Sequence, residues 1–312
     1  MTISQGARPV AGILLTVAAM VTLAATDAIS KHLTAVYPIV QILWLRYLLY
    51  AVYGVHLAGS PSGGGFRSRC LALQIARAAI LVVSNMVIVY SFSQLPLADV
   101  HAVIAVAPLL VTAGSVLVLS ETVHRQRWAA VGAGFAGILI ILRPGLGVLD
   151  PIAFTPLAGA CLYALYQILT RLAGRHDDHS TTQFFTAAGG LVCFSAAVPF
   201  LWVTPDPAGW TWLALAALGG TLAHVLIIRG LHLAPASTVA PFNYTMLVAA
   251  TVFGYLVFDD LPDRWTVTGA SLVVGSGLYA LHRERLANRS VDRRALDRTA
   301  GGRSEAGRTK AG

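Results

Sequence analysis

Residues 69–92 read RCLALQIARAAILVVSNMVIVYSF, an apolar run in which Arg77 is the only charge after Arg69. A helix needs roughly 20 such residues to cross about 30 Å of hydrocarbon. Only helices and closed barrels satisfy their own backbone groups in lipid, and this run is about twice the length of a barrel strand. The run therefore predicts a membrane-spanning helix.

Similar runs fill most of the 312 residues, and Gly, Pro and charged residues separate them. Hydrophobic residues make up 56% of the chain and charged residues 12%, whereas soluble domains carry roughly 25% charge. This composition excludes a secreted, DNA-binding or cytosolic enzyme. We expect an all-α membrane protein with ten transmembrane helices. The predicted spans lie near residues 10–33, 37–58, 69–92, 97–119, 125–143, 152–173, 181–203, 209–230, 236–258 and 265–282.

The distribution of Lys and Arg predicts the orientation. If the N-terminus is cytoplasmic, 17 of the 22 Lys and Arg residues fall on the cytoplasmic side and three fall outside. This bias follows the positive-inside rule, so both termini are expected in the cytoplasm. Nine of the 17 lie in residues 283–312, a segment with few large apolar residues. We expect a disordered basic tail that lies beside anionic lipid rather than one that binds nucleic acid.

The two halves of the chain resemble each other at a nearly constant offset of 137 to 140 residues. The matching pairs are residues 24–31 with 164–171, Pro96 with Pro235, and Arg127-Trp128 with Arg264-Trp265. We interpret them as a duplicated five-helix unit at residues 10–145 and 152–282. An odd number of helices inserts the second copy with opposite polarity. Such inverted repeats build secondary transporters that hold substrate near the midplane.

Several short motifs along the chain are specific when taken together. They are Asp27-Ala28-Ile29-Ser30-Lys31, Trp44-Leu45-Arg46-Tyr47, Gln94-Leu95-Pro96-Leu97-Ala98, Leu119-Ser120-Glu121, and Arg127-Trp128 with Leu142-Arg143-Pro144-Gly145. Through them the chain resembles the drug/metabolite transporter superfamily, of the EamA type, over residues 10 to 282. The resemblance implies a ten-helix carrier in the bacterial inner membrane, with two EamA-type repeats, a small-molecule substrate and no cofactor. Whether the carrier acts alone or as a homodimer is left open.

Two features are similar to the S-adenosylmethionine and riboflavin uptake branch of that superfamily. One is the Asp-x-x-x-Lys pattern of Asp27 and Lys31, and the other is Ala240-Pro241-Phe242-Asn243-Tyr244. The resemblance implies uptake of a heteroaromatic metabolite such as riboflavin or S-adenosylmethionine. Export of amino acids or drugs is the alternative, because related carriers work in both directions.

Polar residues inside membrane spans tend to face a cavity or a partner, so they are the candidate site residues. The substrate-binding candidates are Trp44, Arg46, Arg77, Ser84, Asn85, Tyr163, Gln167, His224, Asn243 and Tyr244, and Asp27 is the candidate for coupling to protons. Arg46 suits a fork that binds a carboxylate or ring carbonyl, or a buried pair with Asp27. For Asp27 itself, a pair with Lys31 one turn later is preferred over proton coupling.

Other positions are expected to serve the scaffold. Pro108 and Pro241 should break the hydrogen-bond ladder of two cavity-lining helices. Small residues spaced about four apart should let the fifth and tenth helices approach closely. These small residues are Ala130, Gly134, Gly137, Ser271 and Gly275. Asp99 and His101 are expected to be solvated at a helix mouth.

Two other classes of protein remain as alternatives. An integral-membrane enzyme would need a metal site, and His176-Asp177-Asp178-His179 is the one candidate, although a solvated turn is the better interpretation. Cys70, Cys161 and Cys193 show no spacing typical of disulfides or metal ligands. A scaffold or receptor that transports nothing is the other alternative.

Overall fold

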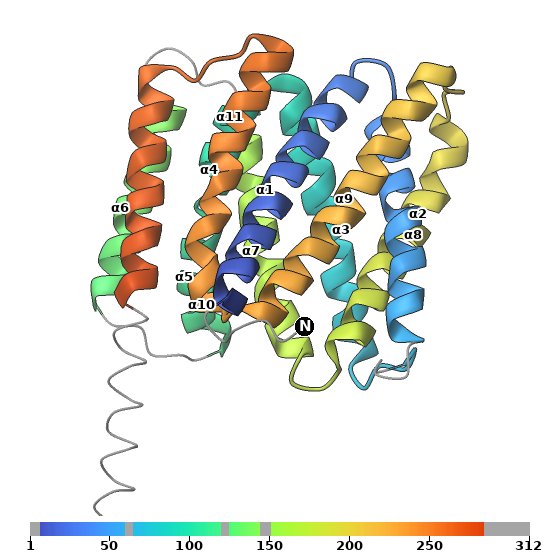
Figure 1. Ribbon diagram of the computed structural model, residues 1–312, viewed down its shortest axis with the longest axis horizontal. Helices are drawn as coiled ribbons and strands as arrows, with labels where there is room; N and C mark the ends of the chain where they lie inside the picture. Colours follow the sequence, from blue (N-terminus) through green and yellow to red (C-terminus); the bar gives the residue numbers. More distant parts are fainter. Residues whose placement is uncertain (1–6, 60–64, 120–124, 144–150, 284–312) are drawn as a thin grey trace, which may run out of the picture.

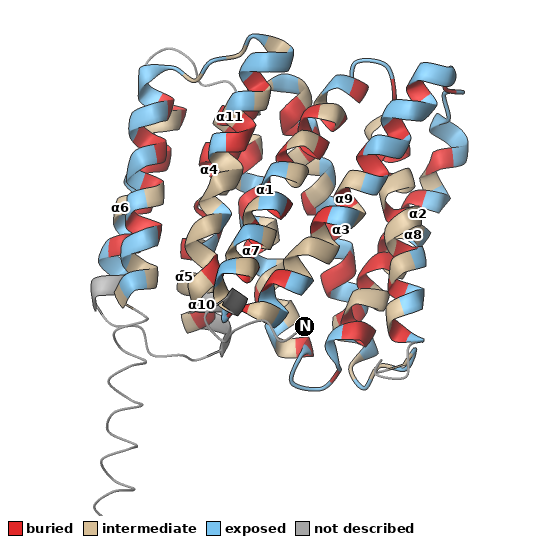
Figure 2. Ribbon diagram, in the orientation of Figure 1, coloured by how far each residue is buried: buried red, intermediate tan, exposed pale blue. Residues whose placement is uncertain are grey.

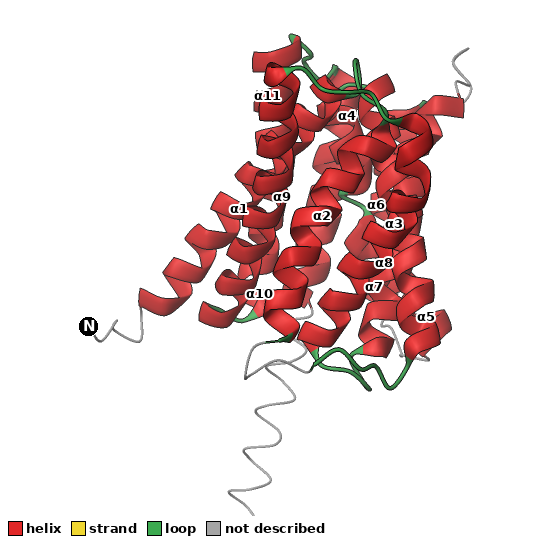
Figure 3. Cartoon of the chain, turned by 90° about the vertical axis from the view of Figure 1, so that its right-hand side faces the viewer, coloured by secondary structure: helices red, strands yellow, loops and turns green. Residues whose placement is uncertain are grey.

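The computed structural model describes residues 7–59, 65–119, 125–143 and 151–283, and its regular structure in these ranges is entirely helical (Figure 3). The helices of the first half are α1 (Ala7–Leu33), α2 (Ile39–Ala58), α3 (Leu71–Gln94), α4 (Leu97–Ile104), α5 (Ala107–Leu119) and α6 (Arg125–Leu142). Those of the second half are η1 (Pro151–Phe154), α7 (Thr155–Ala173), α8 (His179–Leu201), α9 (Pro207–Leu233), α10 (Ala236–Val239), η2 (Ala240–Tyr244) and α11 (Thr245–Phe258). Residues 264–283 form a further helix.

Eight helical segments in the described ranges are long and apolar enough to cross a membrane. They are Pro9–Leu33, Ile39–Ala58, Leu71–Gln94, Leu97–Val116, Pro151–Ala173, His179–Leu201, Pro207–Leu233 and Ala240–Phe258. Trp128–Leu142 is apolar but shorter. The all-α membrane class is therefore confirmed for the described residues, while the count of ten crossings in two inverted repeats stays a prediction. The basic tail beyond residue 283 lies outside the described residues.

Helices of the first half pack along helices of the second. α1 lies along α9, α2 against α8 and α3 against α7 (Figure 1). At the left edge of Figure 1, α6 lies beside the helix of residues 264–283. The two halves thus interleave, and any site between α1, α2 and α9 is built from both of them.

Glycine allows the closest of these approaches. A Cβ on Gly137 of α6 would lie 2.7 Å from the carbonyl oxygen of Gly269, and a Cβ on Gly269 would lie 2.5 Å from that of Gly137. Because backbone meets backbone here, no side chain fits at either position. The expected close packing of these two helices is confirmed. Gly275 was also expected to serve it, but a Cβ added there would meet open space, with no atom within 4 Å.

The outer surface of the bundle is apolar. Phe200, Val192 and Leu256 expose 84%, 69% and 69% of their surfaces, and exposed positions recur along the helices in Figure 2. Large apolar side chains facing outward suit lipid rather than water.

Two of the predicted spans are discontinuous helices. The fourth divides into α4 and α5 just before Pro108, and the ninth divides into α10, the short 3₁₀ segment η2 and α11 around Pro241. Proline has no N–H to donate, so the ladder shortens locally to bonds such as Leu109 N to Val106 O at 2.8 Å. The expected breaks at both prolines are confirmed.

Candidate functional site

Three ionisable side chains meet where α1, α2 and α4 face one another. Arg46 Nη1 lies 3.7 Å from Asp27 Oδ1, and His101 Nε2 lies 3.5 Å from Asp27 Oδ2. Asp27 and His101 are only 7% and 6% exposed. We call Asp27, Arg46, His101 and the adjacent Ser30 the Asp27 cluster. The pair of Arg46 with Asp27, one of the two sequence-based interpretations, is confirmed.

The guanidinium of Arg46 is only lightly engaged. Its hydrogen bond to protein within the described residues is a long one, from Nη1 to Ser30 Oγ at 3.4 Å. Gly220 of α9 faces it, and a Cβ at that position would lie 3.5 Å from Nε and 3.7 Å from Nη2. A guanidinium carries five N–H donors in a fork. Most of this donor capacity is left over for a group that the protein itself does not supply.

His224 and Tyr50 lie beside this cluster. His224 Nδ1 is 2.8 Å from the carbonyl oxygen of Gly220, one turn earlier in α9. Because a carbonyl only accepts, Nδ1 carries the hydrogen and Nε2 of the neutral ring is an acceptor. The ring lies 4.9 Å from that of Tyr50, whose hydroxyl donates to Gln183 Oε1 at 2.8 Å. α9 of the second half thus contributes aromatic and polar groups next to Arg46.

Three more candidates are already held by protein partners. Asn85 Nδ2 donates to the Tyr47 hydroxyl at 2.8 Å, and Ser84 Oγ donates to the carbonyl of Gly159 at 3.0 Å. Trp44 Nε1 donates to Ser195 Oγ at 2.9 Å. These bonds fix α2 and α3 against α7 and α8.

Arg77 differs from Arg46, because its side chain is fully buried and all of its N–H donors have protein partners. Its partners are Thr170 Oγ1 at 3.1 Å, Gln74 Oε1 at 2.5 Å, the Thr182 carbonyl at 2.9 Å, the Tyr166 hydroxyl at 3.2 Å and Thr186 Oγ1 at 2.5 Å. They come from α3, α7 and α8. In this conformation the guanidinium has no donor left for a substrate, so the structure places it as a tie between helices.

The remaining candidates lie on α7 and in η2. Tyr163 stacks on Tyr166 at 6.0 Å, and Gln167 is half-buried on the same helix, α7. Asn243 is exposed in η2. The Tyr244 hydroxyl is buried without a hydrogen-bond partner among the described residues, against Gly277. Within the described ranges, none of these four residues takes part in the hydrogen bond or the ion pair of Arg46.

Two further sequence-based expectations are wrong. Lys31 does not pair with Asp27 one turn before it; its Nζ lies 2.8 Å from Asp260 Oδ2. His101 is buried rather than solvated, because its side chain points into the bundle beside Phe92, with the rings 5.2 Å apart. The sequence signal for His101 was its place within a predicted, largely apolar membrane span, 97–119.

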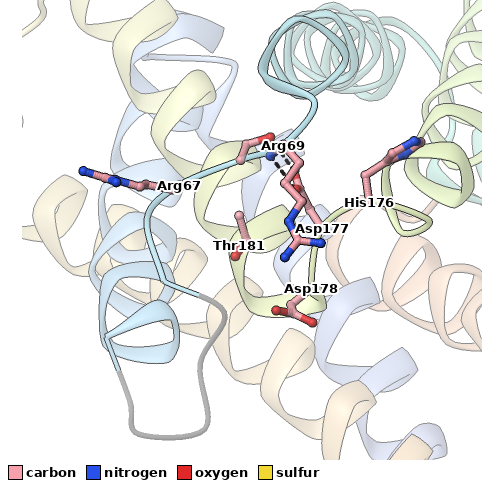
Figure 4. A pocket seen from close by; sticks show the side chains of 7 residues that line it. Arg67, Arg69, His176, Asp177, Asp178 and Thr181 are labelled. Carbon is pink, nitrogen blue, oxygen red and sulfur yellow. Dashed lines mark hydrogen bonds between the residues drawn. The ribbon is translucent and has the colours of Figure 1, made fainter.

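A small polar depression lies at one end of the bundle, where the loop before α3 meets the loop before α8 (Figure 4). It measures about 350 Å³, and its walls are Arg67, Ser68, Arg69, His176, Asp177, Asp178 and Thr181. His176, Asp178 and His179 are exposed, as expected for a solvated turn, but Asp177 is buried. The described residues contain no group of three His, Cys, Asp or Glu side chains that could bind a metal.

Asp177 ties these two loops together. Its carboxylate accepts hydrogen bonds from Arg69 N at 2.7 Å, Gln74 Nε2 at 2.8 Å and the Ser68 hydroxyl. Burial alone would raise the pKa of Asp177, but these donors outweigh it and hold the pKa well below its ordinary value. The carboxylate thus holds the loop before α3 against the loop before α8.

Comparison with curated proteins gives matches over most of the chain. The chain is 22% identical to an S-adenosylmethionine uptake transporter of Rickettsia bellii, over 86% of this chain and 92% of that protein. It is 24% identical to a riboflavin transporter of Brucella anthropi, over 81% and 91%. It is 25% identical to the pseudopaline exporter CntI of Pseudomonas aeruginosa, over 84% and 93%.

A solved structure has the same fold. One crystal structure superposes with a TM-score of 0.62 at 17% sequence identity. The superposition covers 88% of this chain and 98% of the chain in that structure. The model of the EamA-like transporter family matches residues 10–143 and again residues 151–281. Together with its membrane-competent helices, this match over most of the sequence shows that the chain is a multi-pass membrane protein of the EamA-like transporter family.

Proposed function

We propose that the protein is a secondary transporter that moves a small organic metabolite across the bacterial inner membrane by alternating access. Two inverted five-helix units, residues 10–145 and 152–282, would rock against each other around a site between them. The two separate matches to the family model support this division. The described chain also begins and ends at the same end of the bundle (Figure 1), which fits cytoplasmic termini.

The observation that carries the proposal is that most of the N–H donors of Arg46 have no protein partner among the described residues. Arg46 lies in a membrane-spanning helix between both halves, close to Asp27, and has a single long hydrogen bond within the described residues. A charged group inside a membrane is costly and needs a reason. A substrate carboxylate or ring carbonyl bound by the guanidinium fork supplies one.

The proposed substrate is a heteroaromatic metabolite, with riboflavin and S-adenosylmethionine as the first compounds to test. The names of two relatives support this choice. Tyr50 lies one turn after Arg46 on the same face of α2, where an aromatic ring suits a fused heteroaromatic substrate. Asp27 remains the candidate for proton coupling.

Reconstitution in liposomes tests the proposal. Labelled riboflavin, S-adenosylmethionine and amino acids are offered with and without a pH gradient. We expect wild-type uptake of one compound and its loss in Arg46→Ala at matched membrane abundance. Arg229→Ala, at an exposed position of α9, is the matched control and should transport normally. Wild-type rates in Arg46→Ala would refute the assignment of the site.

Export is the second candidate, and the Pseudomonas aeruginosa exporter among the relatives favours it. Alternating access is reversible, so the gradients decide the direction. Liposomes preloaded with the transported compound distinguish the two candidates. An inward pH gradient that drives net loss of the compound would support export, whereas accumulation would support uptake.

A further inference from the structure

His101 carries an unexplained polar atom inside the bundle. Its Nε2 is buried and has no hydrogen-bond partner among the described residues, and the side chain is 94% buried. A buried polar group that lacks a partner destabilises the fold. Asp27 Oδ2 lies 3.5 Å away, just beyond ordinary hydrogen-bond length. A small movement of either side chain would join the two atoms.

Asp27 is the one ion-pair partner of His101 in the described part of the chain. Phe92 of α3 covers one side of the ring, and α11 contributes the apolar residues Ala249 and Ala250 to the same core. α6 and α7 pack on α4 through the apolar core of Val103 and Ile138. Across Asp27, the next charge is Arg46 at 3.7 Å.

The charges of the cluster depend on one another. With the shared proton on His101, the cluster carries one net positive charge, because the charges of Arg46 and Asp27 cancel. A substrate oxygen that binds Arg46 competes with the Asp27 carboxylate for the same donors. Once it loses its cation in a medium of low dielectric, a carboxylate favours binding a proton. His101 is the group within reach that can give up a proton or take one.

We propose that Asp27 and His101 hold one proton between them, and that substrate binding at Arg46 moves this proton onto Asp27. In this step the Nε2–H bond of the imidazolium breaks and an Oδ2–H bond forms, which leaves both groups neutral. When the substrate leaves, the Oδ2–H bond of Asp27 breaks, its proton passes to water and the carboxylate pairs with Arg46 again. His101 Nε2 then takes up the next proton from water, which restores the starting state. The inference rests on the proposed transport function and adds His101 to it as the partner in coupling.

Transport in liposomes gives the first test, with riboflavin and S-adenosylmethionine as probes. We expect His101→Gln to lose accumulation driven by a pH gradient but to retain counterflow, which needs no net proton movement. His56→Gln, at the exposed end of α2, is the matched histidine control and should accumulate as the wild type does. If His101→Gln accumulates the probe to the wild-type level, the inference is wrong.

Infrared spectroscopy of the full-length protein in lipid gives a second test that needs no substrate. The carboxylic acid band of Asp27 should appear on acidification and be absent in Asp27→Asn. In His101→Gln the band should appear at a higher pH, because the proton can no longer reside on the imidazole. A band with an unchanged midpoint would overturn the pair. If the wild type transports neither probe, the proposed substrates fail, and the infrared result still decides the inference.

Discussion

Lys31 Nζ lies 2.8 Å from Asp260 Oδ2, and this ion pair joins the end of α1 to the segment just after α11. Lys31 also donates to the carbonyl of Leu95 at 3.0 Å, and its ammonium lies 4.6 Å from the centre of the Phe258 ring. One lysine therefore connects three segments from both halves at the same end of the bundle.

Lys31→Ala should destabilise the protein more than Asp260→Ala does. Losing a partly exposed ion pair costs up to about 1 kcal/mol, and losing the cation–π contact adds about 0.5–1 kcal/mol. Thermal unfolding in detergent measures both variants. The swap of Lys31→Asp with Asp260→Lys should recover only part of the loss, because Leu95 and Phe258 then have no cation. Equal losses in the two alanine variants would contradict this assignment.

Asp177→Asn should weaken the contact between the loops before α3 and α8 in a pH-dependent way. The folded-state pKa of Asp177 lies below the ordinary value of 3.8. The carboxylate therefore contributes stability above that pH and loses it as the pH falls toward the folded-state pKa. After allowance for solvent screening, we expect a cost of about 1 kcal/mol at neutral pH.

The neighbouring Asp178→Asn is the control for this pH dependence. Asp178 is exposed and its side chain makes no capping hydrogen bond at the start of α8. Unfolding curves at pH 7 and near pH 3 should show a difference between the wild type and Asp177→Asn that shrinks on acidification, and little effect of Asp178→Asn at either pH. A difference that grew at low pH would reverse the assigned sign.

The helical fold was predictable because a membrane leaves few ways to satisfy the backbone. The breaks at Pro108 and Pro241 were predictable because proline lacks a donor wherever it lies in a helix. The pair of Asp27 with Arg46 was predictable for a related reason: a span with few charges offers few possible partners. In each case the prediction rested on a property of the residue itself or on the small number of possible charged partners in the spans.

The predictions that failed concerned contacts between segments that are distant in the sequence. Lys31 had an acid one turn away in sequence, yet its partner is Asp260, 229 residues later. His101 was judged by its nearness to a helix end, but burial depends on how α4 packs against α3, α7 and α11. The engagement of Arg77 needed five partners on three helices, which no spacing along the chain reveals.

Gly137→Val or Gly269→Val should separate α6 from the helix of residues 264–283. Each new side chain would meet a backbone carbonyl, which cannot move aside as a flexible side chain can. Overpacking of this kind costs about 1–3 kcal/mol. Gly275→Ala is the control, since no atom lies within 4 Å of the added carbon. Unfolding midpoints in detergent compare the three variants, and a Gly137→Val protein as stable as Gly275→Ala would show that the two helices do not meet there.

Arg77→Ala should reduce the amount of folded protein, whereas Arg46→Ala should leave it unchanged. Removing Arg77 leaves the buried side-chain oxygens of Gln74 and Thr186 without its N–H donors, at a cost on the order of 3 kcal/mol. Arg46 has one long hydrogen bond and its ion pair with Asp27 to lose, and Asp27 can bind a proton once its partner is gone, so the removal costs transport more than stability.

Arg77→Lys separates charge from geometry at this tie between helices. An ammonium keeps the charge but has three donors on one atom and cannot reproduce the planar fork that spans α3, α7 and α8. We therefore expect Arg77→Lys to unfold at a temperature between those of Arg77→Ala and the wild type. Membrane abundance and unfolding temperature check both substitutions. A stable Arg77→Ala protein that had lost only transport would instead indicate that Arg77 binds the substrate.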